Sequence, residues 1–296
     1  QQCMMAFAMA MDLSVELSTG EKELKQYILA GNSDKLLDYL GKHSGLVQAA
    51  FGGCLLHEAI AGRAGHFLIA SLLQNYEVDI NEMDLKGFTP LLLAVKMGLV
   101  ETVATLVDNG CNVNSYSKHG KDTALHLCLC LGSPSLEILR KLLDNGAQVD
   151  APNESGSSPI HIACLNGDAE AVEILLAHKA KIDSISPEVG SPLHIACEQG
   201  NTAILGLLLE AGAGVNINLQ DQNGWSPLHL ACYYGRLDIV WLLLNNGASM
   251  LAKDHSGKLP GEFFSHDTAA DVGRRVQRVL LEFNLLHQEG AWETLA

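Results

Sequence analysis

A four-residue motif recurs at a nearly constant interval along most of this sequence. Its copies read CLLH at 54–57, TPLL at 89–92, TALH at 123–126, SPIH at 158–161, SPLH at 191–194 and SPLH at 226–229. The last residues of successive copies are 35, 34, 35, 33 and 35 positions apart. A fixed period near 33 predicts stacked structural repeats, each too small to bury its apolar face without a neighbour.

The copy at residues 221–247 shows how each repeat is expected to fold. Asp-Gln-Asn-Gly at 221–224 is a turn signal, and Ser226-Pro227 supplies an N-cap followed by a proline at the first helical position. A short helix should then end at Gly235. Residues 237–244 have the 3.6-residue apolar period of a second helix. Each repeat is therefore predicted to contain one turn and two helices.

This pattern resembles the ankyrin-repeat family over about residues 50 to 260. The resemblance rests on TPL at 89–91, on Asp/Asn-x-x-Gly turns that begin at 84, 153, 221 and 254, and on Gly-Ala after the second helix at 146 and 247. It implies an all-α fold with short β-hairpin loops, an ankyrin-repeat solenoid of about six repeats plus terminal caps. In this family the short first helices line a concave face.

The chain is expected to divide into four parts. Residues 1–20 are interpreted as a flexible or vector-derived N-terminus, 21–50 as an N-terminal helical cap, and 51–253 as the ankyrin repeats. Residues 254–296 are interpreted as a degenerate C-terminal repeat and a capping helix from about 268 to 286 that carries Arg274, Arg275 and Arg278. Such a cap is expected to turn polar residues outward, because no further repeat covers it.

Composition excludes several classes of protein. The formal net charge of −15 opposes binding to phosphate backbones, so no nucleic-acid partner is expected. The longest apolar stretches fall far short of the roughly 20 residues that a membrane span needs, and no secretory signal is evident. Most of the eight cysteines fall inside predicted helices, which favours a reducing compartment, cytoplasmic and/or nuclear. The chain is expected to be monomeric on its own.

No catalytic motif is evident, and neither a metal nor another cofactor is expected. The spacing His-x-x-Cys occurs at His161/Cys164, His194/Cys197 and His229/Cys232, and it would place each pair near one helix face, as a zinc site requires. In the ankyrin pattern, however, the histidine orders the loop through hydrogen bonds, and the position three residues later needs a small buried side chain. The structural interpretation is therefore preferred.

The family pattern also indicates where a partner would bind. Ankyrin partners contact the hairpin tips and the first helices, positions that correspond here to Phe88, Lys96, Met97, Lys118, His119, Glu198, Gln199, Trp225, Tyr233 and Tyr234. Tryptophan and tyrosine are enriched at binding hot spots, so the contact centre is predicted at Trp225, Tyr233 and Tyr234. The alternative is that the tryptophan covers a hairpin and the tyrosine pair packs against the last cap.

Glu198 holds in its repeat the place that Tyr233 holds in the next, so stacking should bring its carboxylate beside the aromatic rings. Aromatic faces with a carboxylate favour a cationic side chain, hence a partly basic protein segment, with a methyl-lysine peptide as a sharper version. We expect a non-catalytic protein–protein interaction scaffold or adaptor. The alternative is a substrate-recruiting or regulatory module of a larger enzyme or ubiquitin-ligase complex.

Overall fold

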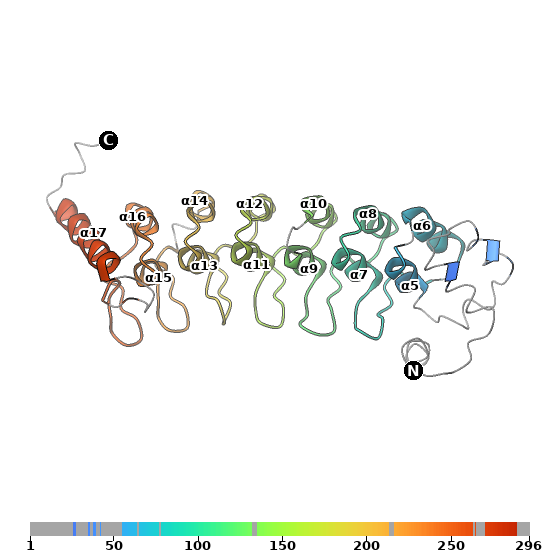
Figure 1. Ribbon diagram of the computed structural model, residues 1–296, viewed down its shortest axis with the longest axis horizontal. Coiled ribbons are helices and arrows are strands. Elements are labelled where there is room, and N and C mark those ends of the chain that lie inside the picture. Colours follow the sequence, from blue (N-terminus) through green and yellow to red (C-terminus); the bar gives the residue numbers. More distant parts are fainter. Residues whose placement is uncertain are drawn as a thin grey trace. The chain divides into compact units, whose positions relative to one another are not determined.

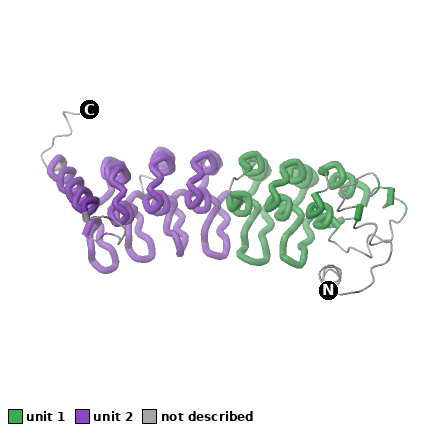
Figure 2. The backbone as a smooth tube through the Cα atoms, in the orientation of Figure 1, with its two compact units in different colours: residues 1–148 green, residues 149–296 purple. Residues whose placement is uncertain are grey.

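The computed structural model describes residues 55–63, 65–76, 78–131, 135–212, 216–262, 264 and 270–288, together with positions 26, 27, 35, 38, 39 and 42. The expected N-terminal segment (1–20) and almost all of the expected N-terminal cap (21–50) lie outside the described residues. The chain divides into two compact units, residues 1–148 and 149–296, which are coloured separately in Figure 2.

From residue 55 onward, the described part of unit 1 contains three consecutive helix pairs. Its helices are α5 (Leu55–Ala61), α6 (His66–Asn75), α7 (Pro90–Lys96), α8 (Val100–Asp108), α9 (Ala124–Cys130) and α10 (Leu136–Asp144). Within each pair the short first helix packs against the second, and each first helix also packs against the first helix of the next pair. The second helices α6, α8 and α10 pack in the same way.

The described residues of unit 2 have the same order, with three helix pairs and one long terminal helix. Its helices are α11 (Pro159–Asn166), α12 (Ala169–Ala177), α13 (Pro192–Gln199), α14 (Thr202–Glu210), α15 (Pro227–Tyr233), α16 (Leu237–Asn245) and α17 (Ala270–Gln288). Figure 1 shows α11, α13 and α15 in one row and α12, α14 and α16 in a second, with the hairpin loops on the side of the first row. The last helix, α17, packs on α16.

Within the described residues the fold is helical, as the sequence predicts. The loops contain two isolated β-bridges, Tyr116 with Thr123 and Ser186 with Gly190, and no longer strand is present in this part of the chain. None of the described helices combines the length and apolarity that crossing a membrane requires.

The recurring motif forms the start of each first helix. In α15, Ser226 is the N-cap, Pro227 occupies the first turn, and His229 completes a capping box through Nδ1, which lies 3.0 Å from the Ser226 nitrogen and 2.8 Å from its Oγ. The same box begins α9, α11 and α13. In α7 the cap is Thr89, whose hydroxyl accepts from the nitrogen of Leu92, the residue that replaces histidine there.

The second nitrogen of the motif histidines joins one repeat to the next. Because the backbone N–H of the N-cap residue donates to Nδ1, the proton of the neutral ring resides on Nε2. In His194 this nitrogen donates to the carbonyl oxygen of Trp225 at 2.9 Å, and in His229 to that of Lys258 at 3.2 Å. His194 and His229 therefore each fix both the helix that they begin and the hairpin of the following repeat.

The predicted turns are closed by their first residue. Asp221 accepts the N–H groups of Asn223 and Trp225 through Oδ1, both at 2.8 Å, and Asp254 does the same for Ser256 and Lys258. The glycine of each turn has a positive φ, +77° at Gly224, which explains why this position needs glycine. Backbone and side chain together make each hairpin a rigid support for the residues at its tip.

Candidate partner-binding surface

The ten residues that the sequence singles out fall into two sets, one in each unit. Unit 2 holds Glu198, Gln199, Trp225, Tyr233 and Tyr234, and unit 1 holds Phe88, Lys96, Met97, Lys118 and His119. All ten are exposed or half-buried, so each has surface that a partner can contact.

The backbone of Trp225 is held from three directions. Its N–H donates to Asp221 Oδ1, its carbonyl oxygen accepts from the Asp221 nitrogen at 2.9 Å, and the same oxygen accepts from His194 Nε2. The indole therefore projects from a fixed point at the base of the hairpin. An anchor residue that is already fixed before binding loses less conformational entropy when the complex forms.

Trp225, Tyr233 and Tyr234 form one group, called the aromatic cluster below. The rings of Trp225 and Tyr233 meet edge to face with centroids 5.1 Å apart, and those of Tyr233 and Tyr234 do so at 5.0 Å. These separations are typical of favourable aromatic pairs, so the rings stabilise one another. All three remain only half-buried, which leaves an aromatic surface toward solvent.

Glu198 lies at the edge of the aromatic cluster, as the repeat register predicts. The hydroxyl of Tyr234 donates to Glu198 Oε1 at 3.0 Å. The pKa of Tyr234 is raised, first by burial of its hydroxyl and then by its hydrogen bond to Glu198. The hydroxyl thus stays protonated and holds the carboxylate in place, while the other carboxylate oxygen retains the capacity to accept from a ligand. Gln199 follows at the exposed end of α13.

Arg236 is a neighbour of this site that the sequence reasoning missed. Its Nη2 donates to the carbonyl oxygen of Glu198 at 3.3 Å, and its guanidinium lies over Gly200, where an added Cβ would be 2.9 Å from Cζ. The only signal in the sequence was its position directly after Gly235, the glycine that follows α15. One side of the site therefore already carries a positive charge, which limits where a cationic group of a partner can approach.

The candidates of unit 1 form a smaller, basic surface. Lys96 Nζ lies 4.5 Å from the centroid of the Phe88 ring, a cation–π geometry. The hairpin that bears Phe88 is held by His57 Nε2, which donates to the Phe88 carbonyl oxygen at 2.8 Å. The Lys118 nitrogen donates to the Gly87 oxygen at 3.0 Å, so the second hairpin lies directly against the first. Met97 is half-buried at the end of α7, and His119 is exposed.

The His-x-x-Cys pairs occupy structural positions. Cys164, Cys197 and Cys232 are fully buried, and burial raises the pKa of Cys164 and of Cys232 to about 12 and that of Cys197 further. Both ring nitrogens of His161, His194 and His229 take part in hydrogen bonds within the protein, and these bonds account for the motif without a metal ion. In the part of the chain that the structure describes, no three His, Cys, Asp or Glu side chains cluster in a way that could hold a metal ion.

His57 departs from the common arrangement. Its Nδ1 is buried without a hydrogen-bond partner among the described residues, and the sequence has Cys54 where the other histidine-bearing copies have serine or threonine. A buried acceptor without a partner is destabilising. Burial lowers the pKa of His57, so its ring stays neutral.

The comparisons with known proteins agree with this architecture. A family model described as ankyrin repeats matches three stretches, 24–117, 114–186 and 185–254, which together run through most of the 296 residues. The chain therefore belongs to the ankyrin-repeat family. Ankyrin repeats are generally modules that bind other proteins, and the fold is typically non-catalytic.

Curated relatives match about half of the chain. Human neurogenic locus notch homolog protein 2 is 35% identical over 136 residues, which is 45% of this chain and 5% of the relative. The E3 ubiquitin-protein ligase KEG of Arabidopsis thaliana is 33% identical over 130 residues, 44% of this chain and 8% of the relative. The chain thus corresponds to only a small part of each of these longer proteins.

Solved ankyrin domains match more of the chain. The ankyrin-repeat domain of Bcl-3, a member of the IkappaB protein family, superposes with a TM-score of 0.62 and 27% identity, covering 86% of this chain and 97% of the domain. This likeness supports the assignment of repeats well beyond the segment shared with the curated relatives.

Proposed function

We propose that this chain is a protein-interaction scaffold that binds a partly basic segment of a partner protein, with the aromatic cluster and Glu198 as the contact centre. The observation that carries the proposal is the combination of three touching, half-exposed aromatic rings with a carboxylate held at their edge by Tyr234. A lysine or arginine placed over such rings gains cation–π attraction and a charge partner together.

The rigidity of the support strengthens this proposal. Trp225 is fixed through its backbone by the preceding repeat, and Tyr233 and Tyr234 end α15, so none of the three relies on a long flexible loop. Aromatic anchors on rigid elements lose little entropy on binding and are the residues that dominate interface energies.

The position of Arg236 refines the kind of segment that would fit. Its guanidinium lies on the Gly200 side of Glu198, so a second cation is repelled there. We infer that one basic side chain enters over the aromatic cluster from the side away from Arg236. The rest of the segment is then free to contact neighbouring hairpins.

Affinity capture with quantitative mass spectrometry tests the proposal. The bait is compared with a variant in which Trp225, Tyr233 and Tyr234 are all alanine, and with the matched control Phe67→Ala, whose side chain is 78% exposed on α6 in the other unit. Partners lost with the triple variant and kept by the control are the specific ones.

The recovered segment is then measured as a synthetic peptide by calorimetry. We expect each tyrosine-to-alanine change to weaken binding by about tenfold or more, because hot-spot truncations cost about 2 kcal/mol. Replacing single lysines or arginines with glutamine identifies the residue over the cluster, and matched methylated peptides test the methyl-lysine version. Unchanged partners and affinities in a folded triple variant would overturn the proposal.

The similarity to the ligase KEG gives one observation in favour of a second candidate, a substrate-recruiting module attached to a catalytic or ligase segment. The binding surface would be the same in both cases. Ubiquitination of the recovered partner in cells that express the full-length gene product, lost with the triple variant, supports this second candidate. Binding without any change in the partner's ubiquitination speaks against it.

A further inference from the structure

A ladder of polar side chains links successive repeats and stops at the end of the array. The Oδ1 atoms of Asn81, Asn114, Asp150 and Asn218 accept the backbone N–H of residues 112, 148, 181 and 249, at 2.7–2.8 Å. Donors 112 and 148 lie two positions before Asn114 and Asp150, the ladder residues of their own repeats. The next ladder position after 249 is therefore 251, where the chain has leucine instead of asparagine or aspartate.

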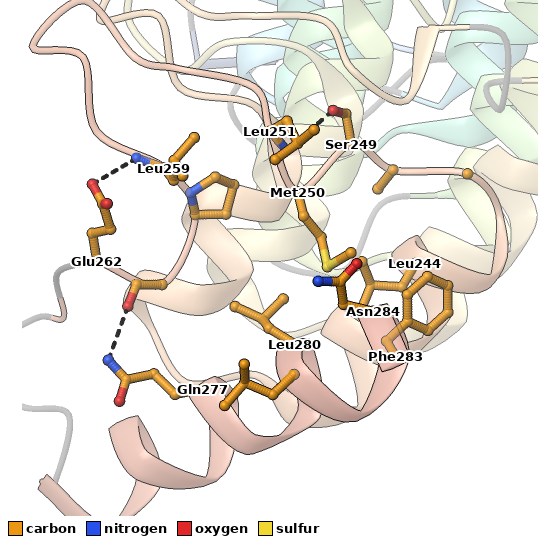
Figure 3. A pocket seen from close by; sticks show the side chains of 15 residues that line it. Leu244, Ser249, Met250, Leu251, Leu259, Glu262, Gln277, Leu280, Phe283 and Asn284 are labelled. Atoms are coloured by element: carbon orange, nitrogen blue, oxygen red, sulfur yellow. Dashed lines mark hydrogen bonds between the residues drawn. The ribbon is translucent and has the colours of Figure 1, made fainter. Parts of the chain in front are cut away.

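Leu251 lies at the rim of an apolar groove. Its side chain is 79% exposed, a position at which a polar residue would be expected. The groove has a volume of about 700 Å³ and runs between residues 244–262 and α17 (Figure 3). In Figure 3, Leu280 and Phe283 of α17 face Met250 across it. This volume is in the range of sites that take several apolar groups.

The walls of the groove are preformed. Phe283 is 4% exposed and packs edge to face on Trp241 of α16, with centroids 6.1 Å apart. Gln277 Nε2 donates to the carbonyl oxygen of Gly261, whose missing side chain leaves room for Leu280. The groove therefore needs no large rearrangement to accept a ligand.

The outer face of α17 differs from the polar cap that the sequence predicts. Leu281 is 65% exposed and Leu285 56%. At 100° per residue they share one face with Arg274 and Arg278, on the side of α17 opposite its buried residues. The apolar surface thus extends from the groove over the rim of the helix and ends in positive charge.

Three positively charged side chains lie on α17. Arg274, Arg275 and Arg278 are exposed, in a chain whose net charge is −15. Arg274 lies 3.9 Å from Asp271, a long contact between two exposed groups, and in the described residues neither Arg275 nor Arg278 forms an ion pair. An acidic segment of a partner would gain attraction from these arginines.

We propose that this groove, called the terminal groove below, binds an amphipathic helix of a partner protein. Acidic residues flank the apolar face of that helix. Leucine-sized side chains one helical turn apart occupy the groove beside Leu251 and Leu281, and the acidic residues lie against Arg274 and Arg278. This is the helix-in-groove mode of recognition, in which apolar anchors give affinity and flanking charges give orientation.

A second copy of this chain fits the same surface less well. A symmetric contact repeats one surface on both sides, so it would bring the arginines of two α17 helices into one interface, where like charges repel. An acidic helix instead pairs with each of these charges. The terminal groove and the aromatic cluster then recognise segments of opposite charge.

A displayed peptide library tests the proposal before the partner is identified. Random 16-residue peptides on phage are panned against the full chain, with counter-selection against Leu251→Asn, which restores the residue type of the inner repeats. Enriched sequences are expected to repeat apolar residues at helical spacing with Asp or Glu beside them. Failure to enrich any sequence, or enrichment of peptides without acidic residues, would overturn the proposal.

The most enriched peptide is then synthesised and measured by fluorescence anisotropy. We expect Leu281→Gln to weaken binding at least tenfold, and Arg274→Glu with Arg278→Glu to weaken it at least tenfold and reduce its dependence on salt. Both sites are exposed, so circular dichroism should show unchanged folding, and the aromatic-cluster variant should bind this peptide normally. Equal affinity for all variants, or a dimer in light scattering that Leu281→Gln dissociates, would contradict the proposal.

Discussion

His194 offers the sharpest test of how neighbouring repeats are held together. Its ring is 1% exposed and makes three contacts: Nδ1 with the nitrogen and Oγ of Ser191, at 3.2 and 2.7 Å, and Nε2 with the carbonyl oxygen of Trp225, at 2.9 Å. Replacement by alanine removes the capping box of α13 and the link to the next hairpin in a single change. We therefore expect a loss of stability well above that of a surface substitution.

The magnitude follows from the groups that are left behind. Ser191 is fully buried, and leaving its hydroxyl without a partner costs about 1–3 kcal/mol. Loss of the bond to Trp225 costs about 1 kcal/mol more, so the expected total is about 2–4 kcal/mol. Because domains are commonly stable by about 5–15 kcal/mol, the variant should fold with a clearly lower unfolding midpoint.

Urea unfolding followed by far-ultraviolet circular dichroism measures this loss. The matched control is His119→Ala, an exposed histidine, for which we expect a change within about 0.5 kcal/mol. A double-mutant cycle with Ser191→Ala separates the hydroxyl from the ring: once the hydroxyl is gone, removing the histidine should cost less by about 1 kcal/mol. A loss below about 1 kcal/mol for His194→Ala, or strictly additive losses in the cycle, would refute the reasoning.

Three further predictions follow from burial and backbone geometry. Burial lowers the pKa of His194 below its ordinary value of 6.5, so on acidification the unfolded chain binds the proton before the folded chain does. The contribution of His194 to stability should be complete above about pH 6.5 and should fall below it. Urea midpoints measured between about pH 5.5 and 7.5 should therefore depend less on pH in His194→Gln than in the original chain. Among the described thiols, exposed Cys130 should react with a maleimide before buried Cys197, and mass mapping that finds Cys197 modified in the native state would contradict this. Gly224→Ala, whose Cβ would lie 2.6 Å from the His255 nitrogen, should destabilise more than Gly247→Ala, where φ is also positive but nothing lies within 4 Å; thermal denaturation that ranks the two variants equally would disprove the steric argument.

Residues close together in the sequence determine the local structure of each repeat. A serine or threonine three positions before a histidine forms the capping box, and an aspartate or asparagine three positions before a glycine closes the hairpin. These contacts depend on local backbone geometry alone, so spacing predicts them. The repeat period then predicts that Glu198 lies beside the aromatic cluster, because equivalent positions of successive repeats stack next to each other.

Contacts between side chains of different repeats were decided only by the tertiary structure. That the Glu198 carboxylate accepts from Tyr234, 36 positions away, and that Arg236 lies over Gly200 depend on side-chain rotamers and on how closely two repeats approach. A repeat pattern specifies neither. The terminal groove is a still clearer case: the sequence predicts a polar cap helix, whereas the way α17 packs through Phe283 leaves Leu251 and Leu281 exposed. The pattern ends where the repeats end, and beyond that point only packing decides which apolar residues are buried and which remain exposed.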